Sequence, residues 1–314
     1  MTRRTLLAAA IALLVAGSGS ASAETLTIFG AGTLAAPFRQ IDAAFEKLHP
    51  GVVAHAQFGG SVMMARKITD LHQHADVLAV ADYSVIPKFL FGESKAADWY
   101  AGFARNAITF VYTDKSKFAP EVSPANWYDV LARPGVQIGR PNPDTDPAGY
   151  QTLQMLALAE RYYGSPGVAA KVLANAPREN IRDTETELLA ALQLGQIDYL
   201  AIYRSDALQH HLRYLELPAA IDLSDPARAA AYATATARTK NGDLPGKPII
   251  YAVTVPTGAD QPELAAAVVA FLLGPAGQAI MGDNGFGNVE PADAVNIDKM
   301  PASLRSLVVP WPSD

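Results

Sequence analysis

Near its start the chain reads Leu26-Thr27-Ile28-Phe29-Gly30-Ala31-Gly32-Thr33, an alternating stretch that ends in a glycine-rich turn. Alternation of apolar and polar residues predicts a β-strand that is buried on one face. Apolar residues then recur at Phe38, Ile41, Phe45 and Leu48, which is the spacing of one helix face. The stretch therefore predicts a strand, a tight turn and a helix, which together are the repeating unit of an α/β fold.

The same order of elements recurs along the chain. Residues 52–58 predict a second strand, and Gly59-Gly60-Ser61 separate it from a helix that carries Met64, Ile68 and Leu71 on one face. Residues 77–80 are continuously apolar, as in a buried parallel strand. Further strands are predicted at 108–112, 136–139, 197–203 and 248–255. Because no linker-like segment is present, we expect the chain to cross between domains on strands.

Length and composition limit the classes of protein to consider. A chain of 314 residues predicts about two domains. With 50% hydrophobic and 18% charged residues, the chain can form a large core and is not a disordered protein. The absence of cysteine excludes disulfides, thiolate metal sites, a cysteine nucleophile and a lipid-modified cysteine. A net charge of −6 argues against a nucleic-acid partner, because binding phosphates needs clustered Lys and Arg.

Residues 1–23 have the pattern of an export signal. Arg3 and Arg4 precede a short apolar stretch at residues 6–16, and Ala21-Ser22-Ala23 form a cleavage site of small residues. We expect cleavage between Ala23 and Glu24 and a periplasmic or other extracytoplasmic location. Two neighbouring arginines are also typical of the twin-arginine route, so this route and the Sec route both stay open.

Four predicted strand-to-helix loops could bind a ligand, since ligands of open α/β sheets lie outside the carboxyl ends of the strands. They are residues 30–33, 59–61, 144–149 and 182–185. In the first two loops, glycines precede the hydroxyl groups of Thr33 and Ser61 at a helix start, an arrangement that can bind an anion. The alternative is that both hydroxyls are ordinary helix caps.

Several other patterns have competing interpretations. Gly30, Gly32 and Ala35 fit a dinucleotide motif, but the next strand lacks its acidic residue. Asp144 and Asp146 could hold a divalent cation or form a turn. Thr184 and Glu187 predict a capping box, which leaves Glu185 unexplained. The two histidine pairs, His72 with His74 and His210 with His211, are expected to be solvated.

The motifs, in their order along the chain, resemble the molybdate/tungstate-binding proteins of ABC importers, and most closely the tungstate-binding WtpA branch. The resemblance covers nearly the whole chain after residue 23. It is carried by these segments: Phe29-Gly30-Ala31-Gly32-Thr33-Leu34, Gly60-Ser61, Arg66-Lys67-Ile68-Thr69, Ala75-Asp76-Val77, Ala81-Asp82-Tyr83, Asp98-Trp99-Tyr100, Asn126-Trp127-Tyr128, Asp146-Pro147-Ala148-Gly149-Tyr150, Thr184-Glu185-Thr186-Glu187-Leu188, Ile197-Asp198-Tyr199, Tyr203-Arg204-Ser205, Gln209-His210, Leu217-Pro218 and Gly246-Lys247-Pro248-Ile249.

The resemblance implies an α/β fold, that of a type II periplasmic binding protein with two α/β lobes joined by a two-strand hinge. The expected lobes are residues 24–108 with 250–314, and residues 109–249. The resemblance also implies that Thr33, Ser61 and Tyr203 donate hydrogen bonds to the oxoanion. In the tungstate branch two carboxylates also bind the metal atom of the ligand, and they fall here on Asp146 and Glu185.

The chain departs from the family pattern near these positions. Thr33 stands where the family usually has Ser, Ala148 and Gln151 stand where it has Cys and Arg, Asp183 replaces a common Pro and Glu187 a common Asp. The five ligand positions themselves are kept, so the departures concern fine selectivity.

We therefore expect a monomeric, non-enzymatic binding protein that needs no cofactor. Its ligand would be molybdate or tungstate, and its partner the permease of an ABC importer at the membrane. The alternatives are a binder of a sulfate-like oxoanion, a binder of ferric ion through Tyr162 and Tyr163, or an exported metal-dependent hydrolase that uses Asp144 and Asp146.

Overall fold

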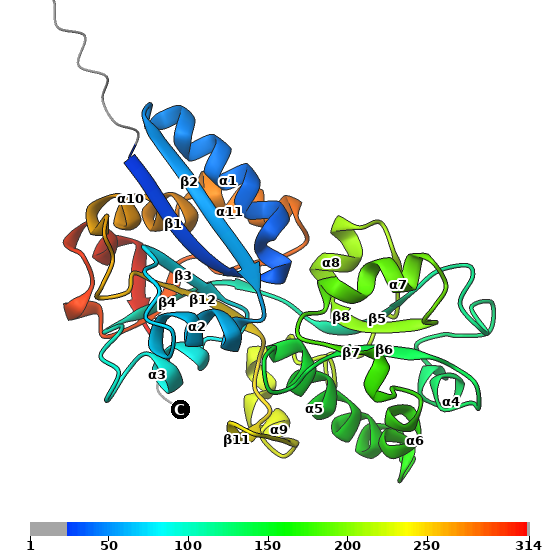
Figure 1. Cartoon of the computed structure of the whole chain (residues 1–314). Coiled ribbons are helices and arrows are strands. Elements are labelled where there is room, and N and C mark those ends of the chain that lie inside the picture. The colour runs from blue at the N-terminus through cyan, green and yellow to red at the C-terminus, as the bar shows by residue number, and fades with distance from the viewer. Residues whose placement is uncertain (1–23, 313–314) are drawn as a thin grey trace, which may run out of the picture.

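Two β-sheets divide the protein into two lobes (Figure 1). The computed structural model describes residues 24–312, so the predicted signal peptide at residues 1–23 lies outside the described residues. Lobe 1 has an eight-stranded sheet with the order β15-β14-β4-β12-β3-β1-β2, and β13 pairs with β4. Its strands are β1 (Glu24–Ala31), β2 (Val52–Gly59), β3 (Val77–Val80), β4 (Tyr100–Arg105), β12 (Ile250–Thr254), β13 (Gly287–Asn288), β14 (Ala292–Val295) and β15 (Val308–Pro310).

The helices of lobe 1 pack on both faces of this sheet (Figure 1). They are η1 (Gly32–Leu34), α1 (Ala35–Leu48), α2 (Ser61–Thr69), α3 (Val85–Phe89), α10 (Pro262–Leu273), α11 (Pro275–Asp283), η5 (Ile297–Lys299) and η6 (Ala302–Leu307). Phe38, Ile41 and Phe45 on α1 are buried as predicted, but Leu48 and Leu71 are 65% and 64% exposed. Leu48 lies on the predicted helix but is its last residue, whereas the prediction of Leu71 on a helix was wrong because α2 ends at Thr69.

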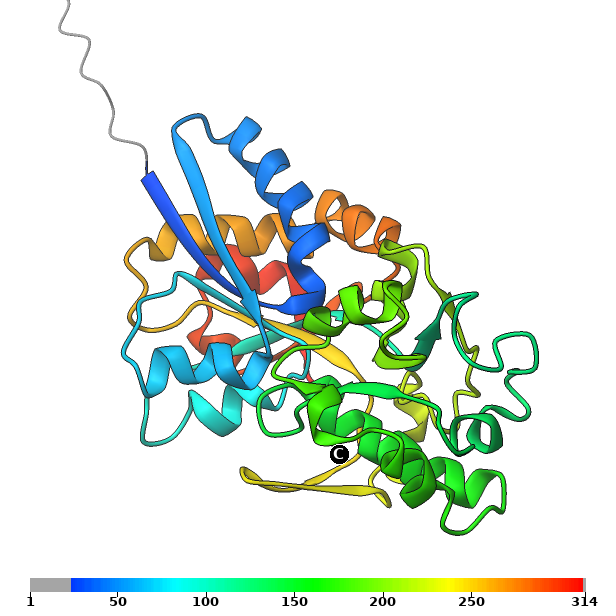
Figure 2. The same ribbon diagram turned by 45° about the vertical axis from the view of Figure 1, so that its right-hand side comes forward.

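Lobe 2 has a five-stranded sheet with the order β7-β6-β8-β5-β9. Its strands are β5 (Ile108–Tyr112), β6 (Ile138–Pro141), β7 (Ile181–Arg182), β8 (Tyr199–Tyr203) and β9 (Arg213–Tyr214). Its helices are α4 (Trp127–Leu131), α5 (Pro147–Tyr162), α6 (Val168–Ala174), η2 (Arg178–Asn180), η3 (Thr186–Leu188), α7 (Leu189–Gln193), α8 (Arg204–Gln209), η4 (Pro226–Arg228) and α9 (Ala229–Tyr232). A separate hairpin, β10 (Thr236–Thr239) and β11 (Gly242–Pro245), packs on α5 and extends toward lobe 1 (Figure 2).

The chain crosses between the lobes twice. The first crossing is the two-residue segment Asn106-Ala107 between β4 and β5, and the second is residues 246–249 between β11 and β12. The Asn106 N–H donates to Ile249 O at 3.2 Å, so the crossings are hydrogen-bonded to each other. Two short, paired segments of this kind can serve as a hinge between rigid lobes.

Among the described residues, no single helix is long and apolar enough to cross a membrane. The pair α10 and α11 meets that test only when taken together, and the two helices are bent by 61° at the break between them. Val268, Val269 and Leu272 of α10 are buried in the core of lobe 1.

Candidate functional site

Thr33 and Ser61 lie at the same edge of the lobe 1 sheet. The strands β1 and β2 are parallel neighbours, so their carboxyl ends meet. Thr33 follows β1 within η1, Ser61 begins α2 after β2, and each is 1% exposed. The Thr33 hydroxyl lies 2.8 Å from the Tyr251 hydroxyl, and Ser61 Oγ accepts a 2.9 Å bond from the Ala81 N–H. This edge presents two fixed hydroxyl groups.

Neither hydroxyl caps its helix. The N-cap positions are Ala31 for η1 and Gly60 for α2, and neither makes a side-chain cap hydrogen bond. The interpretation of Thr33 and Ser61 as ordinary caps is therefore wrong, because each residue lies inside the first turn and its hydroxyl is engaged elsewhere.

Asp146, Glu185 and Tyr203 lie at the corresponding edge of lobe 2. The strands β7, β6 and β8 are parallel neighbours. Glu185 follows β7, Asp146 follows β6, and Tyr203 is the last residue of β8. Asp146 is the N-cap of α5 and accepts a 2.9 Å bond from the Ala148 N–H. Glu185 precedes η3. The three side chains are 2%, 1% and 0% exposed.

Asp146 and Glu185 are neighbouring buried carboxyl groups. Burial raises the pKa of Asp146 well above its usual range, and the neighbouring Glu185 raises it further. A third carboxyl, Asp206 on α8, is 1% exposed, and burial followed by Glu185 raises its pKa in the same way. Glu185 Oε2 and Asp206 Oδ2 have no hydrogen-bond partner among the described residues. The site thus holds three buried carboxyl groups, and two of their oxygen atoms have no hydrogen-bond partner among the described residues.

Tyr203 makes its hydrogen bond within lobe 2. Its hydroxyl donates a 2.7 Å bond to Gln151 Oε1 on α5. Burial is the main cause that raises the pKa of Tyr203 well above its usual range, with smaller contributions from Tyr251 and Asp146, so the phenol stays protonated. The family resemblance implied Tyr203 as a ligand donor, but it did not identify the partner of that hydroxyl.

Sequence reasoning missed several residues of this site: Asn106, Gln151, Asp206 and Tyr251. Asn106 Nδ2 donates to Ser205 Oγ at 2.8 Å and to the Tyr251 hydroxyl at 3.3 Å, which connects the hinge to the partner of Thr33. A local signal existed for Asp206, three residues after Tyr203, and for Gln151, which stands where the family usually has Arg. The others lie inside a regular strand or at a crossing, where polar residues have no distinctive spacing.

The two edges are in direct contact. A Cβ atom at Gly60 would overlap the Thr145 carbonyl oxygen and lie 2.9 Å from that of Asp183, both in lobe 2. A Cβ atom at Gly32 would lie 3.2 Å from Glu185 Oε1. The lobes are therefore closed on each other, and the five predicted residues, Thr33, Ser61, Asp146, Glu185 and Tyr203, are buried where they meet.

A hollow of about 230 Å³ lies beside this buried cluster. Residues of both lobes line it, among them Gly32, Arg39 and Phe58 from lobe 1 and Asp206 and His210 from lobe 2. Since Gly32 and Asp206 also border the cluster, this hollow adjoins it.

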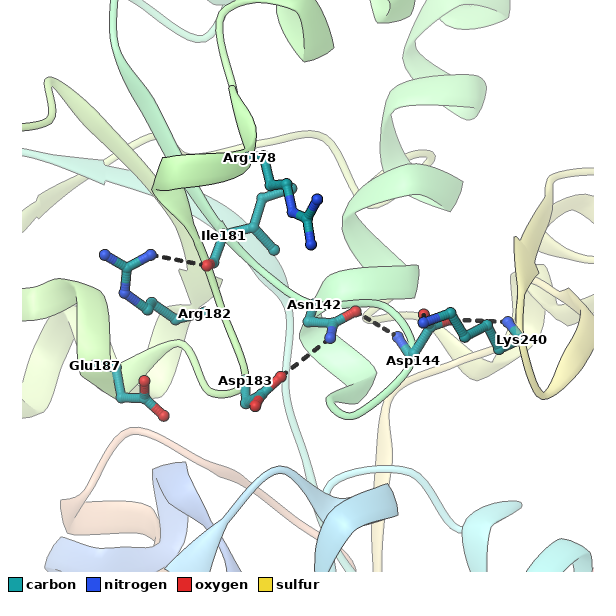
Figure 3. Close-up of a pocket in the computed structure, with 8 residues that line it drawn as sticks. All are labelled: Asn142, Asp144, Arg178, Ile181, Arg182, Asp183, Glu187 and Lys240. Carbon is teal, nitrogen blue, oxygen red and sulfur yellow. Dashed lines mark hydrogen bonds and ion pairs between the residues drawn. The ribbon is translucent and has the colours of Figure 1, made fainter.

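The second loop aspartate, Asp144, belongs to a different hollow, of about 450 Å³ (Figure 3). Its carboxylate accepts a 2.7 Å bond from the Lys240 N–H and lies 3.6 Å from Lys240 Nζ. Asn142, Arg182 and Asp183 also line this hollow, whereas none of the five predicted residues does. Asp144 and Asp146 therefore have different surroundings, and within residues 24–312 no group of three Asp, Glu or His side chains is arranged to hold a metal ion.

The other competing patterns are structural. Tyr163 donates to Pro124 O at 3.0 Å and stacks on Tyr128 at the far end of α5, while Tyr162 is 53% exposed. A helix of 16 residues is about 24 Å long, so this pair is remote from Asp146.

The capping-box prediction was also wrong. The Thr184 hydroxyl donates to Glu187 Oε1 at 3.3 Å, and the N-cap position of η3 is Glu185, which makes no side-chain cap hydrogen bond.

The fold is that of a two-lobed protein, and the candidate site lies where the carboxyl ends of strands from both lobes meet, which is where open α/β sheets bind ligands. The chain belongs to the family of bacterial extracellular solute-binding proteins, whose sequence profile matches residues 26–287. This confirms the expected class.

The relatives agree with the family resemblance found in the sequence. The chain is 35% identical to the molybdate/tungstate-binding protein WtpA of Thermococcus kodakarensis over 335 residues, which cover 95% of this chain and 94% of that protein. It is 39% identical to a solute-binding protein of Petrotoga mobilis over 90% of this chain and 89% of that one. The recognition of the WtpA-like branch is thus confirmed.

Solved structures confirm the fold. The periplasmic molybdate-binding protein of Azotobacter vinelandii matches with a TM-score of 0.63 at 16% identity, covering 84% of this chain and all of that one. The sulfate-binding protein SubI of Mycobacterium tuberculosis H37Rv matches with a TM-score of 0.61 at 16% identity, covering 85% and 88%. At these identities the likeness concerns the fold alone.

Proposed function

We propose that the protein binds molybdate or tungstate between its lobes and delivers it to the permease of an ABC importer. The observation that carries the proposal is the cluster of Thr33, Ser61, Asp146, Glu185 and Tyr203, which lie at or just after the ends of strands in both lobes and are all buried where the lobes meet. The names of the WtpA relatives, at 35% identity over nearly the full chain, support the choice of ligand.

Two buried carboxyls beside a dianion are unfavourable unless something compensates their charge. Coordination of the hexavalent metal atom by Asp146 and Glu185 would supply that compensation, and the buried, unpartnered Glu185 Oε2 is an oxygen available for it. Sulfur and phosphorus do not accept further carboxylate ligands in this way. The metal-binding role of the two carboxylates therefore favours molybdate and tungstate over sulfate and phosphate.

Calorimetric titration of the chain from Glu24 onward with molybdate, tungstate, sulfate and phosphate tests the proposal. We expect tight binding of molybdate or tungstate and much weaker binding of sulfate and phosphate. Equal affinity for all four anions would contradict the coordination of the metal by Asp146 and Glu185. An absence of binding for both metal oxoanions would contradict the proposal as a whole.

The remaining parts of the function rest on the family and the sequence. The protein acts outside the cytoplasm as a monomer, needs no cofactor and catalyses no reaction. The signal-like sequence at residues 1–23 supports export, and sequencing the N-terminus of exported protein should give Glu24 as the first residue. A membrane reconstitution with the importer should show oxoanion uptake only when this protein is present.

A further inference from the structure

Gln151 has a buried amide that is only half satisfied. It lies on α5 and is 1% exposed. Its Oε1 accepts the 2.7 Å bond from the Tyr203 hydroxyl, whereas its Nε2 has no hydrogen-bond partner among the described residues. A buried N–H group without a partner destabilises the protein, because it has lost its bonds to water.

The neighbouring glutamine on the same helix shows the usual arrangement. Gln154 is also 1% exposed, and its Nε2 donates a 2.9 Å bond to Leu244 O. Burial on α5 therefore does not by itself leave an amide unsatisfied. The difference lies in the location, since Gln151 contacts Tyr203 in the cluster of ligand-binding candidates.

Two unsatisfied groups of opposite kind occur in this cluster. Gln151 Nε2 is a donor and Glu185 Oε2 is an acceptor, yet they do not bond each other. An oxoanion of molybdenum or tungsten can satisfy both, because its oxygens accept hydrogen bonds and its metal atom accepts a carboxylate oxygen. An anion that offers only acceptor oxygens would leave Glu185 Oε2 unsatisfied.

We infer that Gln151 donates through Nε2 to an oxygen of the bound oxoanion, and that Tyr203 is a positioning residue that orients this amide. The inference rests on the proposed function and deepens it. Because the Tyr203 hydroxyl holds Oε1, the amide can turn only its N–H groups toward the ligand. The phenol thus decides which end of the amide faces the oxoanion.

Substitution of the two glutamines separates a ligand contact from a structural role. Gln151→Met removes an unsatisfied donor but also the acceptor of the buried Tyr203 hydroxyl, so the unfolding temperature of the ligand-free protein should fall, as it should in Gln154→Met. The affinity of Gln151→Met for tungstate, measured by calorimetry, should fall by about 10- to 100-fold, the range for a hydrogen bond to a charged group. Gln154→Met is the matched control. It should lower the unfolding temperature, because it removes the bond to Leu244 O. It should leave tungstate affinity within about threefold, because that bond involves none of the five predicted site residues.

The Tyr203→Phe background distinguishes a direct contact from an indirect one. If Gln151 donates to the oxoanion, Gln151→Met still weakens tungstate binding when Tyr203 is Phe. If Gln151 only orients the phenol, the second substitution has no further effect, and the inference is overturned. Gln151→Glu, which keeps Oε1 and replaces the donor with an acceptor, should weaken binding more than Gln151→Met, and wild-type affinity in this variant would also overturn the inference. If the unmodified protein binds neither tungstate nor molybdate, the proposed function has failed, which calorimetry of that protein alone reveals.

Discussion

The phenol of Tyr150, on α5 of lobe 2, donates a 2.6 Å hydrogen bond to Oδ2 of Asp82, which follows β3 in lobe 1. The same oxygen lies 3.2 Å from Lys247 Nζ, and Asp82 Oδ1 accepts from the Ser84 N–H. The charge of Asp82 therefore has partners in Lys247 and the Ser84 N–H that do not belong to α5. Among its contacts, the hydrogen bond from Tyr150 is the one that requires the lobes to be closed.

Tyr150→Phe should weaken oxoanion binding by favouring the open form. It removes a hydrogen bond to a charged group, which corresponds to about tenfold or more in affinity. The Asp82 carboxylate keeps Lys247 as a partner, so we expect little change in unfolding temperature. Calorimetry measures the affinity, and Tyr162→Phe, at the exposed end of the same helix, is the control. Equal affinity of Tyr150→Phe and wild type would show that this bond does not hold the lobes together.

Gly60→Ala should obstruct closure. Gly60 has φ −57° and ψ 131°, a conformation open to any residue, so alanine fits lobe 1 alone. In the closed form its Cβ would overlap the Thr145 carbonyl oxygen. Small-angle scattering with tungstate should show a less compact particle than wild type, together with weaker binding. Gly258→Ala is the control, because nothing lies within 4 Å of a Cβ placed there, and an unchanged scattering profile for Gly60→Ala would contradict the prediction.

Substituting the two carboxylates tests whether they coordinate the metal, because the two possibilities predict changes in oxoanion affinity of opposite direction. If Asp146 and Glu185 bind the metal, Asp146→Asn or Glu185→Gln should weaken binding by about 2–5 kcal/mol, or roughly 30-fold or more. If the carboxylates only line the site, neutralising one should relieve repulsion and tighten binding. Metal-edge absorption spectroscopy gives an independent measurement: six oxygen neighbours indicate coordination, and four indicate an oxoanion held by hydrogen bonds alone.

Asp42 on α1 should make stability depend on pH. Burial raises the pKa of Asp42 to about 7, and the neighbouring Glu46 adds to the increase. Because this pKa in the folded state is above the unfolded value of 3.8, folding is favoured while the carboxyl is protonated, and stability falls as the pH rises through this window. Asp42→Asn should therefore unfold at a higher temperature than wild type above about pH 7, with the difference vanishing near pH 4.

The sequence predicts the framework of the site because the rules involved are local. The strands β3 and β5 have the predicted bounds, and parallel strands place their following loops at one edge. For this reason the order of residues along the chain is enough to group Thr33 with Ser61. The roles of Asp146 and Glu185 came instead from the family resemblance, since the residues alone leave several explanations for an acidic loop.

The contacts that complete the site could not be predicted in this way. The bond between Tyr203 and Gln151 joins residues 52 positions apart, and the direction of a buried amide depends on packing from several elements. The same holds for Tyr251 beside Thr33, where 218 positions separate the two hydroxyls. The exposure of Leu48 and Leu71 was not predicted for a simpler reason. An apolar pattern can continue to the end of a helix or beyond it, where the core no longer covers the side chain.

The tip of the β10–β11 hairpin meets lobe 1 through the 2.7 Å bond from Arg66 to Asn241, and both side chains are accessible at this rim. Because the bond joins the hairpin to α2 of lobe 1, opening of the lobes would separate these two residues. The chain contains no cysteine, so thiol-reactive dyes attached to cysteines introduced at positions 66 and 241 would label those two positions alone. A pair of dyes at this rim would turn the protein into an optical sensor whose signal changes as the oxoanion is captured.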